Sequence, residues 1–209
     1  MIPKSISSVA LAALALFGGA AQAVELVSNG NFSSGLTGWY QDAGGAPGSS
    51  ISVVGGAAKL VAGTGPSDVI IKASNLGIGT ITPGASVTVS FDAKGSWSAG
   101  GVNFVELFSE VAPSGTSKSQ LLGGAPLFAQ GKGNLADWTH FTYTTTLGPI
   151  VTGGVSLLLK SSCGADAGCS AISYFDNVSI TAVPEPETYA LMLAGLAGVG
   201  AMVRRRRAA

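Results

Sequence analysis

The residues with the clearest capacity for chemistry alternate along one short segment, 102–112. Phe104 and Phe108 share one phase of this segment with Glu106 and Glu110, while the other phase holds the aliphatic residues Val105, Leu107 and Val111. Two aromatic rings beside two carboxylates can bind a sugar, because rings stack on its apolar face and acids accept hydrogen bonds from its hydroxyls. The alternative is that both phenylalanines lie beneath a loop as a second small core.

Trp97 is a further candidate for stacking on a sugar. It stands in a glycine-flanked run, 95–100, which predicts an exposed turn and an accessible indole ring. The sequence therefore predicts a carbohydrate site made of Trp97, Phe104, Glu106 and Phe108.

The sequence gives little support to catalysis. It has no nucleophile elbow, no phosphate-binding loop and no cluster of zinc ligands. Glu106 and Glu110 would stand about 13 Å apart at their Cα atoms on a strand. The two acids of a glycosidase stand about 5–9.5 Å apart. We expect a protein that is not an enzyme.

Cys163 and Cys169 are the only two cysteines, and they flank one short loop. In an oxidising compartment such a pair is most simply a disulfide. We expect it to fasten a hairpin between the strands that begin near Val155 and Tyr174.

Asp176 shares its phase with Val178 and Ile180, so its carboxylate is expected to point into the interior. A buried carboxylate needs partners. One possibility is a structural calcium ion held together with Glu25 and Asn31, and the other is hydrogen bonding to backbone N–H groups of the first strand. In either case the role is structural, and we expect no required cofactor beyond this possible calcium ion.

The elements that must position these residues are strands. The segments 86–93 and 139–147 alternate between apolar and polar residues, as half-buried strands do. Further strands are expected at 24–28, 51–54, 57–62, 69–73, 102–112, 155–161 and 174–182. Glycine-rich turns separate them, and no long helical period intervenes. The pattern predicts an all-β fold, an antiparallel β-sandwich or jelly roll.

Charge excludes one class of partner. Only 11% of the 209 residues are charged, with 11 basic and 11 acidic side chains. Between residues 24 and 183 there are six lysines against nine acids, so the middle of the chain is mildly acidic. No basic stripe could follow a phosphate backbone, and we expect no nucleic-acid partner.

The first 23 residues have the pattern of a secretory signal peptide. Lys4 precedes an apolar run at 9–20, and Ala21 and Ala23 are small residues where signal peptidase would cleave, after Ala23. The alternative is a buried or membrane-spanning helix, but twelve residues give only about 18 Å of helix against a hydrocarbon layer of about 30 Å.

Residues 183–209 contain three parts in order. A proline-rich motif at 183–187 precedes an apolar helix at 188–203 and a basic cluster, Arg204, Arg205, Arg206 and Arg207. Sixteen apolar residues are marginal for a stable span, and the arginines would hold the far end on the cytoplasmic side. We expect transient contact with the inner membrane.

This tail, with Pro184, Glu185 and Pro186, resembles the PEP-CTERM sorting signal of Gram-negative bacteria that produce exopolysaccharide. The resemblance implies recognition by an exosortase, cleavage near the motif, and delivery to the cell envelope, outer surface or extracellular matrix.

The segment 24–182 is similar to carbohydrate-binding modules of the galactose-binding-like jelly-roll type. The residues that carry the resemblance are Asn29, Gly30, Asn31, Phe32, Gly38, Trp39, the strand from Val87, Trp138, and the closing run 174–180. The family implies core positions for Trp39 and Trp138, and often a calcium ion between first and last strands. Ser33 departs from the acidic residue common there.

The leading hypothesis is a secreted protein that associates with exopolysaccharide through this domain. Two alternatives stay open: a purely structural or adhesive surface protein with no glycan site, and a glycoside hydrolase, which would need two carboxylates converging in one cleft.

Overall fold

The computed structural model describes residues 23–129, 133–182 and 195, and all structural statements concern this part of the chain. The predicted signal helix, the sorting motif, the arginine cluster and all of the predicted apolar helix except Gly195 lie outside it. Within the described part, no helix is long and apolar enough to cross a membrane.

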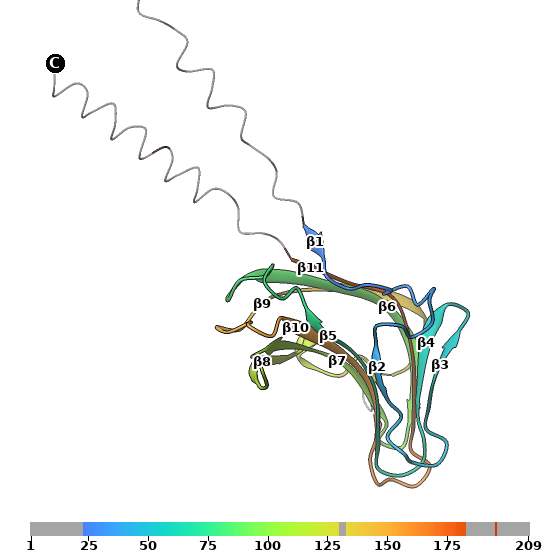
Figure 1. Ribbon diagram of the computed structural model, residues 1–209. Helices are drawn as coiled ribbons and strands as arrows, with labels where there is room; N and C mark the ends of the chain where they lie inside the picture. Colours follow the sequence, from blue (N-terminus) through green and yellow to red (C-terminus); the bar gives the residue numbers. More distant parts are fainter. Residues whose placement is uncertain (1–22, 130–132, 183–194, 196–209) are drawn as a thin grey trace, which may run out of the picture. The chain divides into compact units, whose positions relative to one another are not determined.

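The described domain is a sandwich of two antiparallel sheets, as the alternating pattern predicted (Figure 1). Sheet A has the order β3-β4-β11-β6-β9, with β1 also paired to β11. Sheet B has the order β2-β5-β10-β7-β8. A single turn of 3-10 helix, η1 (Leu122–Gly124), follows β8. The strand bounds are β1 Val24–Glu25, β2 Tyr40–Asp42, β3 Ser50–Val54, β4 Ala57–Ala62, β5 Ser67–Leu76, β6 Ser86–Ser98, β7 Val102–Glu110, β8 Thr116–Leu121, β9 Leu135–Thr146, β10 Val155–Cys163 and β11 Ser170–Ala182.

Nine of these strands fall on predicted segments, and two were missed. The missed strands are β2, which has only three residues, and β8, whose sequence Thr-Ser-Lys-Ser-Gln-Leu has no apolar alternation. Both are outermost strands of sheet B, where one edge is unpaired and little apolar surface is needed.

The chain crosses between the sheets at most connections after β4, so neighbouring strands are remote in sequence. The predicted disulfide between Cys163 and Cys169 is present, with its Cα atoms 5.7 Å apart. The expected hairpin is wrong, because β10 belongs to sheet B and β11 to sheet A. The bridge therefore closes a loop that passes from one sheet to the other.

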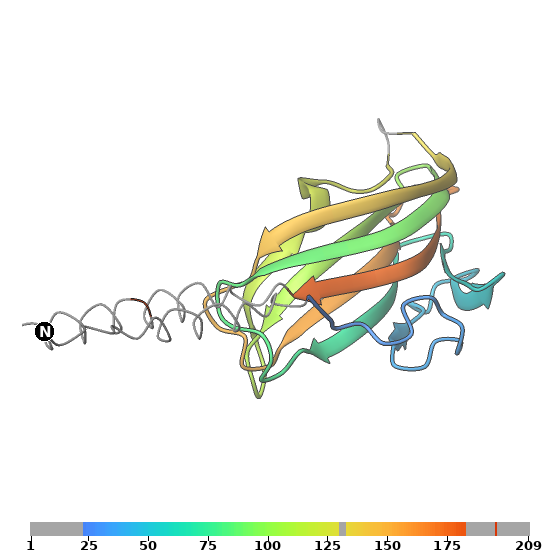
Figure 2. The same cartoon turned by 90° about the horizontal axis from the view of Figure 1, so that it is seen from above.

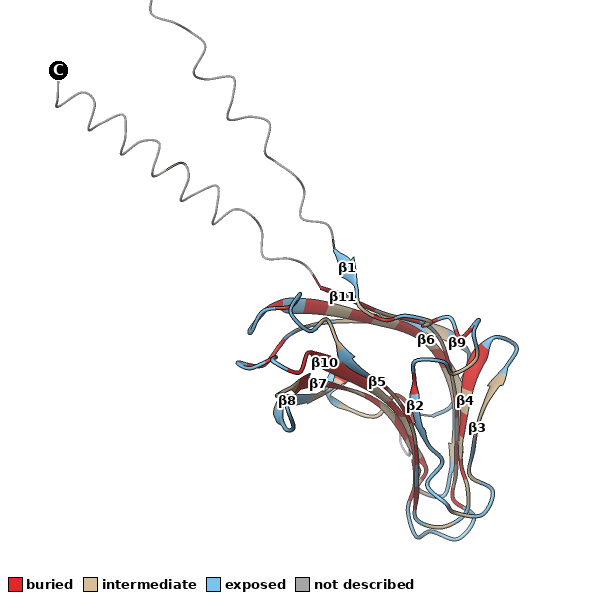
Figure 3. Cartoon of the chain, viewed as in Figure 1, coloured by how far each residue is buried: buried red, intermediate tan, exposed pale blue. Residues whose placement is uncertain are grey.

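The core fills the space between the sheets. Along β6, every second residue from Val87 to Ala93 is buried and the residues between them are half-buried, which gives the banding in Figure 3. Phe91 lies near the middle of this layer, with ring centroids 5.3 Å from Phe141 and 6.0 Å from Phe175. The buried core residues all lie between Val27 and Ala182, so this domain closes a core of its own.

Both sheets curve in the same direction (Figure 1). Sheet A lies on the convex side of the sandwich and sheet B on the concave side. Each sheet has one face in the core and one face exposed, and these two outer faces are the surfaces available to a ligand. They are called the convex face and the concave face below.

Candidate functional site

The segment 29–39, which carries part of the family resemblance, has a structural role rather than a role in binding. Asn29 organises a loop: its amide donates to the carbonyls of Gly35 and Thr37. Phe32 and Trp39 are buried with their ring centroids 5.2 Å apart, so Trp39 is a core residue as the resemblance implied.

A close approach fixes this loop on the last strand. A Cβ atom at Gly30 would lie 1.8 Å from the Val178 carbonyl oxygen, and the Val178 N–H donates to the Gly30 carbonyl at 2.9 Å. Glycine is required at this position because any side chain would displace the loop from β11.

The predicted calcium ligands do not converge. A register shift in β11 lies between Asp176 and Ser179, where Asn177 has a φ of +50°. This β-bulge reverses the phase, so Val178 and Ile180 are buried while Asp176 lies opposite Asp92 on the convex face. The prediction that Asp176 points inward is therefore wrong.

The other two calcium candidates have protein partners. The Glu25 carboxylate accepts backbone N–H groups of Val27 at 2.8 Å and Ile180 at 3.0 Å, and also the Ser179 hydroxyl. Asn31 accepts the N–H of Ser33. No cluster of three or more His, Cys, Asp or Glu side chains in the described part could hold a metal ion. These residues do not fit a calcium site, and the hydrogen bonds that Glu25 accepts from β11 join the first and last strands instead.

The predicted sugar-binding residues of β7 do share the concave face. Val105 and Leu107 are fully buried, while Phe104, Glu106 and Phe108 are half-buried and point away from the core, in the phase that was predicted. Glu106 accepts a hydrogen bond from the Ser119 hydroxyl of β8. The two phenylalanines lie under lysine side chains rather than beneath a loop.

Lys72 of β5 covers one of these rings. Its Nζ lies 5.2 Å from the Phe108 centroid and 2.9 Å from Glu110 Oε1. Burial alone would raise the pKa of Glu110, but hydrogen bonds from Lys72 and two hydroxyls, with the lysine charge, hold it below its ordinary value of 4.5. Glu110 is therefore a fixed anion at neutral pH.

Lys160 of β10 repeats this arrangement over the other ring. Its Nζ lies 5.2 Å from the Phe104 centroid and 2.8 Å from Asp68 Oδ2. Asp68 also accepts the Ser162 hydroxyl at 2.6 Å. Burial opposes ionisation of Asp68, yet these hydrogen bonds and the Lys160 charge keep its pKa below 3.8. Both lysines of this face are thus neutralised by carboxylates.

Tyr40 provides the open aromatic surface on the concave side. It lies in β2 directly opposite Lys72 of β5, and 61% of the residue is exposed. A pocket of about 220 Å³ adjoins Lys72 and Glu110, walled by Asn75 and the loop 111–115. Sequence reasoning missed Tyr40, because a strand of three residues leaves no periodic signal.

Trp97 does not join this face. It lies in β6 of sheet A, where its half-buried side chain packs against the core and its indole N–H donates to the Gly133 carbonyl at 3.1 Å. The prediction of an exposed stacking ring is therefore wrong for Trp97. Trp138, for which the resemblance implied a core position, is instead 45% exposed on the convex face.

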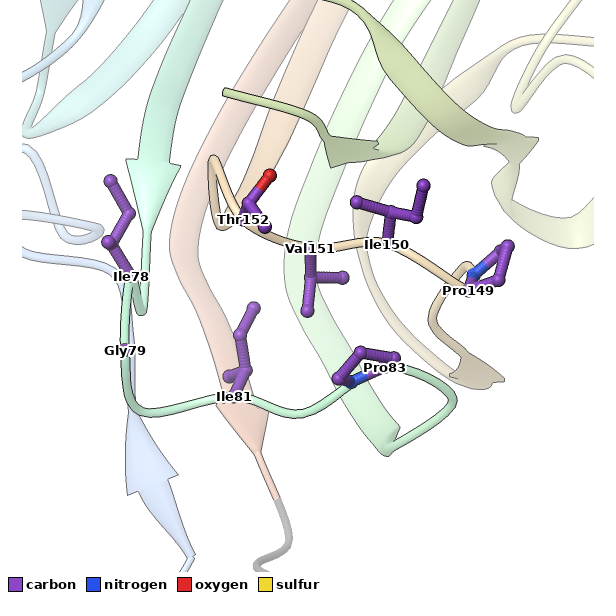
Figure 4. A pocket seen from close by; sticks show the side chains of 8 residues that line it. All are labelled: Ile78, Gly79, Ile81, Pro83, Pro149, Ile150, Val151 and Thr152. Carbon is purple, nitrogen blue, oxygen red and sulfur yellow. The ribbon is translucent and has the colours of Figure 1, made fainter. Parts of the chain in front are cut away.

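A second pocket, of about 470 Å³, lies between two loops at one end of the sandwich (Figure 4). Its walls are Ile78, Ile81, Pro83, Pro149, Ile150 and Val151, with Gly79 and the single hydroxyl of Thr152. The pocket lacks the several polar groups that orient a sugar, and it contains no titratable side chain.

A glycosidase would need two carboxylates in one pocket, and neither pocket described above contains two. Of the two pockets described above, only the concave one contains a carboxylate, that of Glu110, and this acid is paired with Lys72. Asp92 and Asp176 are cross-strand neighbours, but they lie on an open sheet face, where Asp92 binds His140 and Asn177.

Comparison with known proteins identifies the tail. Residues 182–207 match the PEP-CTERM protein-sorting motif, so the chain carries this signal. The motif indicates export and sorting to the cell envelope of a Gram-negative bacterium. No match was found among curated proteins.

The domain has the fold of carbohydrate-binding modules. It is similar to a CBM4 structure, with 16% identity, a TM-score of 0.50, and coverage of 72% of this chain and 99% of that one. It is also similar to the CBM22-1 xylan-binding domain of Paenibacillus barcinonensis Xyn10C, with 17% identity, a TM-score of 0.52, and coverage of 80% and 99%.

A third similar structure is the enzymatically active domain of tailspike protein 4 of bacteriophage CBA120. Identity is 14% and the TM-score 0.54, and the match covers 77% of this chain but only 22% of that one. At these identities the likeness defines the fold alone. The chain thus combines a PEP-CTERM sorting motif with a β-sandwich of the carbohydrate-binding-module type.

Proposed function

We propose that this protein is a non-enzymatic glycan-binding module that an exosortase sorts to the cell envelope or extracellular matrix, where it associates with exopolysaccharide. The observation that carries the proposal is the concave face. There the exposed Tyr40 stands in register with Lys72, beside a polar pocket that contains the Lys72–Glu110 pair.

This arrangement can bind a sugar without catalysing its hydrolysis. The Tyr40 ring supplies an apolar plane for stacking. The Lys72 ammonium group can donate hydrogen bonds to the sugar, and the Glu110 carboxylate can accept them. Each contact is weak. Display of many copies on one surface, facing a polymer with repeated units, would raise the overall avidity.

The site can be tested on residues 24–182, produced with the disulfide formed. We expect at least one soluble polysaccharide in a panel of neutral and acidic polymers to retard the domain in affinity electrophoresis. Tyr40→Ala should weaken that binding about tenfold, the effect of losing one well-stacked ring. Val54→Ala, which trims another exposed apolar side chain, is the matched control.

Sorting can be tested on the protein purified from its host. Its intact mass should correspond to cleavage by signal peptidase after Ala23 and by exosortase near Pro184–Pro186. A purely structural role would leave both cleavages in place but abolish the Tyr40 effect. An uncleaved protein in the cytoplasm would contradict the sorting part of the proposal.

A further inference from the structure

The convex face carries a row in which lysines and aromatic rings alternate across four neighbouring strands. In strand order the row consists of Lys59 on β4, Tyr174 on β11, Lys94 on β6 and Trp138 on β9. Figure 2 looks onto this side of the sandwich, where β11, β6 and β9 lie next to one another. These four residues are called the convex row.

The lysines of the convex row lie close to the rings. Lys59 Nζ is 5.5 Å and Lys94 Nζ 5.2 Å from the Tyr174 centroid, and Lys94 Nζ is also 4.8 Å from the Trp138 centroid. The rings hold both ammonium groups above the sheet, because a cation is attracted to the face of an aromatic ring.

Neither lysine of the row has a carboxylate partner among the described residues. The lysine ion pairs of the described part use Lys72 and Lys160 instead. Of the acids on the same strands, Asp92 binds His140 and Asn177, Asp176 accepts the Asn177 N–H, and Asp137, next to Trp138, forms no ion pair with either lysine. The two ammonium groups therefore keep their hydrogen-bond donors and their charge available.

The row also offers an open ring and a recess. Trp138 is 45% exposed, unlike Trp39 and Phe91, which are buried. A pocket of about 270 Å³ lies along the row, and its lining includes Lys94, Tyr174, Ser96 and Leu135. The row crosses three strand spacings, about 14 Å, which is long enough for a short run of sugar rings.

We propose that the convex row binds an acidic polysaccharide. The Trp138 ring stacks on a sugar ring, and the ammonium groups of Lys94 and Lys59 pair with its uronate carboxylates. This site lies on the opposite face from Tyr40 and uses none of the concave-face residues, so it does not depend on the function proposed above.

The test uses affinity electrophoresis of residues 24–182 with polygalacturonate as the acidic probe and a neutral galactan as the uncharged one. Polygalacturonate should retard the domain, and added salt should weaken this because the pairing is electrostatic. Trp138→Ala should reduce the affinity for polygalacturonate about tenfold. Lys94→Gln should reduce it about fivefold through loss of one charge–carboxylate pair.

Two controls isolate the row. Lys118→Gln removes one positive charge from sheet B, and Val54→Ala trims an exposed apolar side chain of β3 away from the row; both should leave polygalacturonate binding unchanged. Circular dichroism checks that each variant is folded. If Trp138→Ala does not fold, Lys94→Gln still tests the proposal.

The proposal is overturned if polygalacturonate does not retard the wild-type domain, or if retardation persists in both Trp138→Ala and Lys94→Gln. A different result would contradict the concave-face site: Tyr40→Ala would bind every polysaccharide in the panel as strongly as the wild-type domain does.

Discussion

Lysine side chains lie over aromatic rings on both outer faces of the sandwich, but only on the concave face are they also paired with carboxylates. On the concave face, Lys72 and Lys160 each lie over a phenylalanine ring and also pair with a carboxylate. On the convex face, Lys59 and Lys94 lie over aromatic rings without any carboxylate partner in the described part. A lysine over a ring is thus charge-paired on one face and an unpaired cation on the other, and the difference is whether another strand of the same sheet places a carboxylate within reach.

The largest expected effect comes from converting one face into the other. In the double variant Asp68→Asn, Glu110→Gln, both concave lysines lose their anions. We expect the free energy of unfolding to fall by about 1.5 kcal/mol, mostly from Glu110, since its side chain is only 15% exposed and that of Asp68 is 54% exposed. Urea unfolding measures this change.

The same double variant should gain affinity for polygalacturonate even when Trp138→Ala has disabled the convex row. Ser74→Asn adds an amide at an exposed position of β5 without removing a carboxylate or a hydroxyl that binds one, and it serves as the comparison. Unchanged stability together with unchanged binding would show that the carboxylates do not neutralise this face.

Lowering the pH should reduce the stability contributed by the concave face more than that contributed by the convex row. The folded-state pKa values of Glu110 and Asp68 lie below their ordinary values of 4.5 and 3.8, so their contribution to stability is complete above those values. It is lost as the pH falls through the lower folded-state values, when the carboxylates take up protons. Urea unfolding between neutral pH and about pH 2 should show this loss.

The double variant provides the control for this pH dependence, because it lacks both groups and should lose less stability in acid. Asp92 should still contribute there, since the hydrogen bond from Asn177 holds its pKa below 3.8 against the effect of burial, aided by the hydrogen bond and electrostatic attraction of His140. Identical acid slopes for wild type and double variant would contradict the assignment.

A smaller effect is expected from the convex lysines. Lys59→Gln and Lys94→Gln should each lower the free energy of unfolding by only about 0.5 kcal/mol, as for exposed cation–ring contacts. The same urea titrations measure it. A loss of 2 kcal/mol or more, on the scale of a buried interaction, would mean that the row is a structural element rather than a ligand surface.

The smallest effect concerns calcium. Glu25 is engaged with backbone N–H groups and Asp176 faces the solvent side of sheet A, so adding excess calcium or EDTA should leave the melting temperature unchanged. Differential scanning calorimetry of the domain in both conditions makes the comparison. A calcium-dependent rise would restore the metal that the family resemblance implied.

The sequence alone predicted which side chains face the core and which face outward, but not which side chains they contact across the sheet. The phase of β7 was predicted correctly because alternation fixes which side chains leave the core. The lysines over Phe104 and Phe108 were not predicted, because they belong to β10 and β5. The alternation of residues within one strand does not reveal which strands lie beside it in the sheet.

The failed predictions have local causes. Asp176 was placed on the wrong face because the bulge at Asn177 inserts a residue and reverses the alternation. Trp97 was expected to be exposed because glycines flank it. Its position continues the buried phase of Val87 to Ala93 along β6, so a longer reading of the alternation would have placed it toward the core.

The central claim is that the outer face of sheet B binds a glycan, and amide chemical-shift mapping tests it most directly. Isotope-labelled domain is titrated with a polysaccharide that retards it in affinity electrophoresis. Shifts concentrated on β2, β5 and β7 around Tyr40, Lys72 and Glu110, and absent in Tyr40→Ala, are the predicted result. Shifts confined to other surfaces for every polysaccharide that binds would contradict the account.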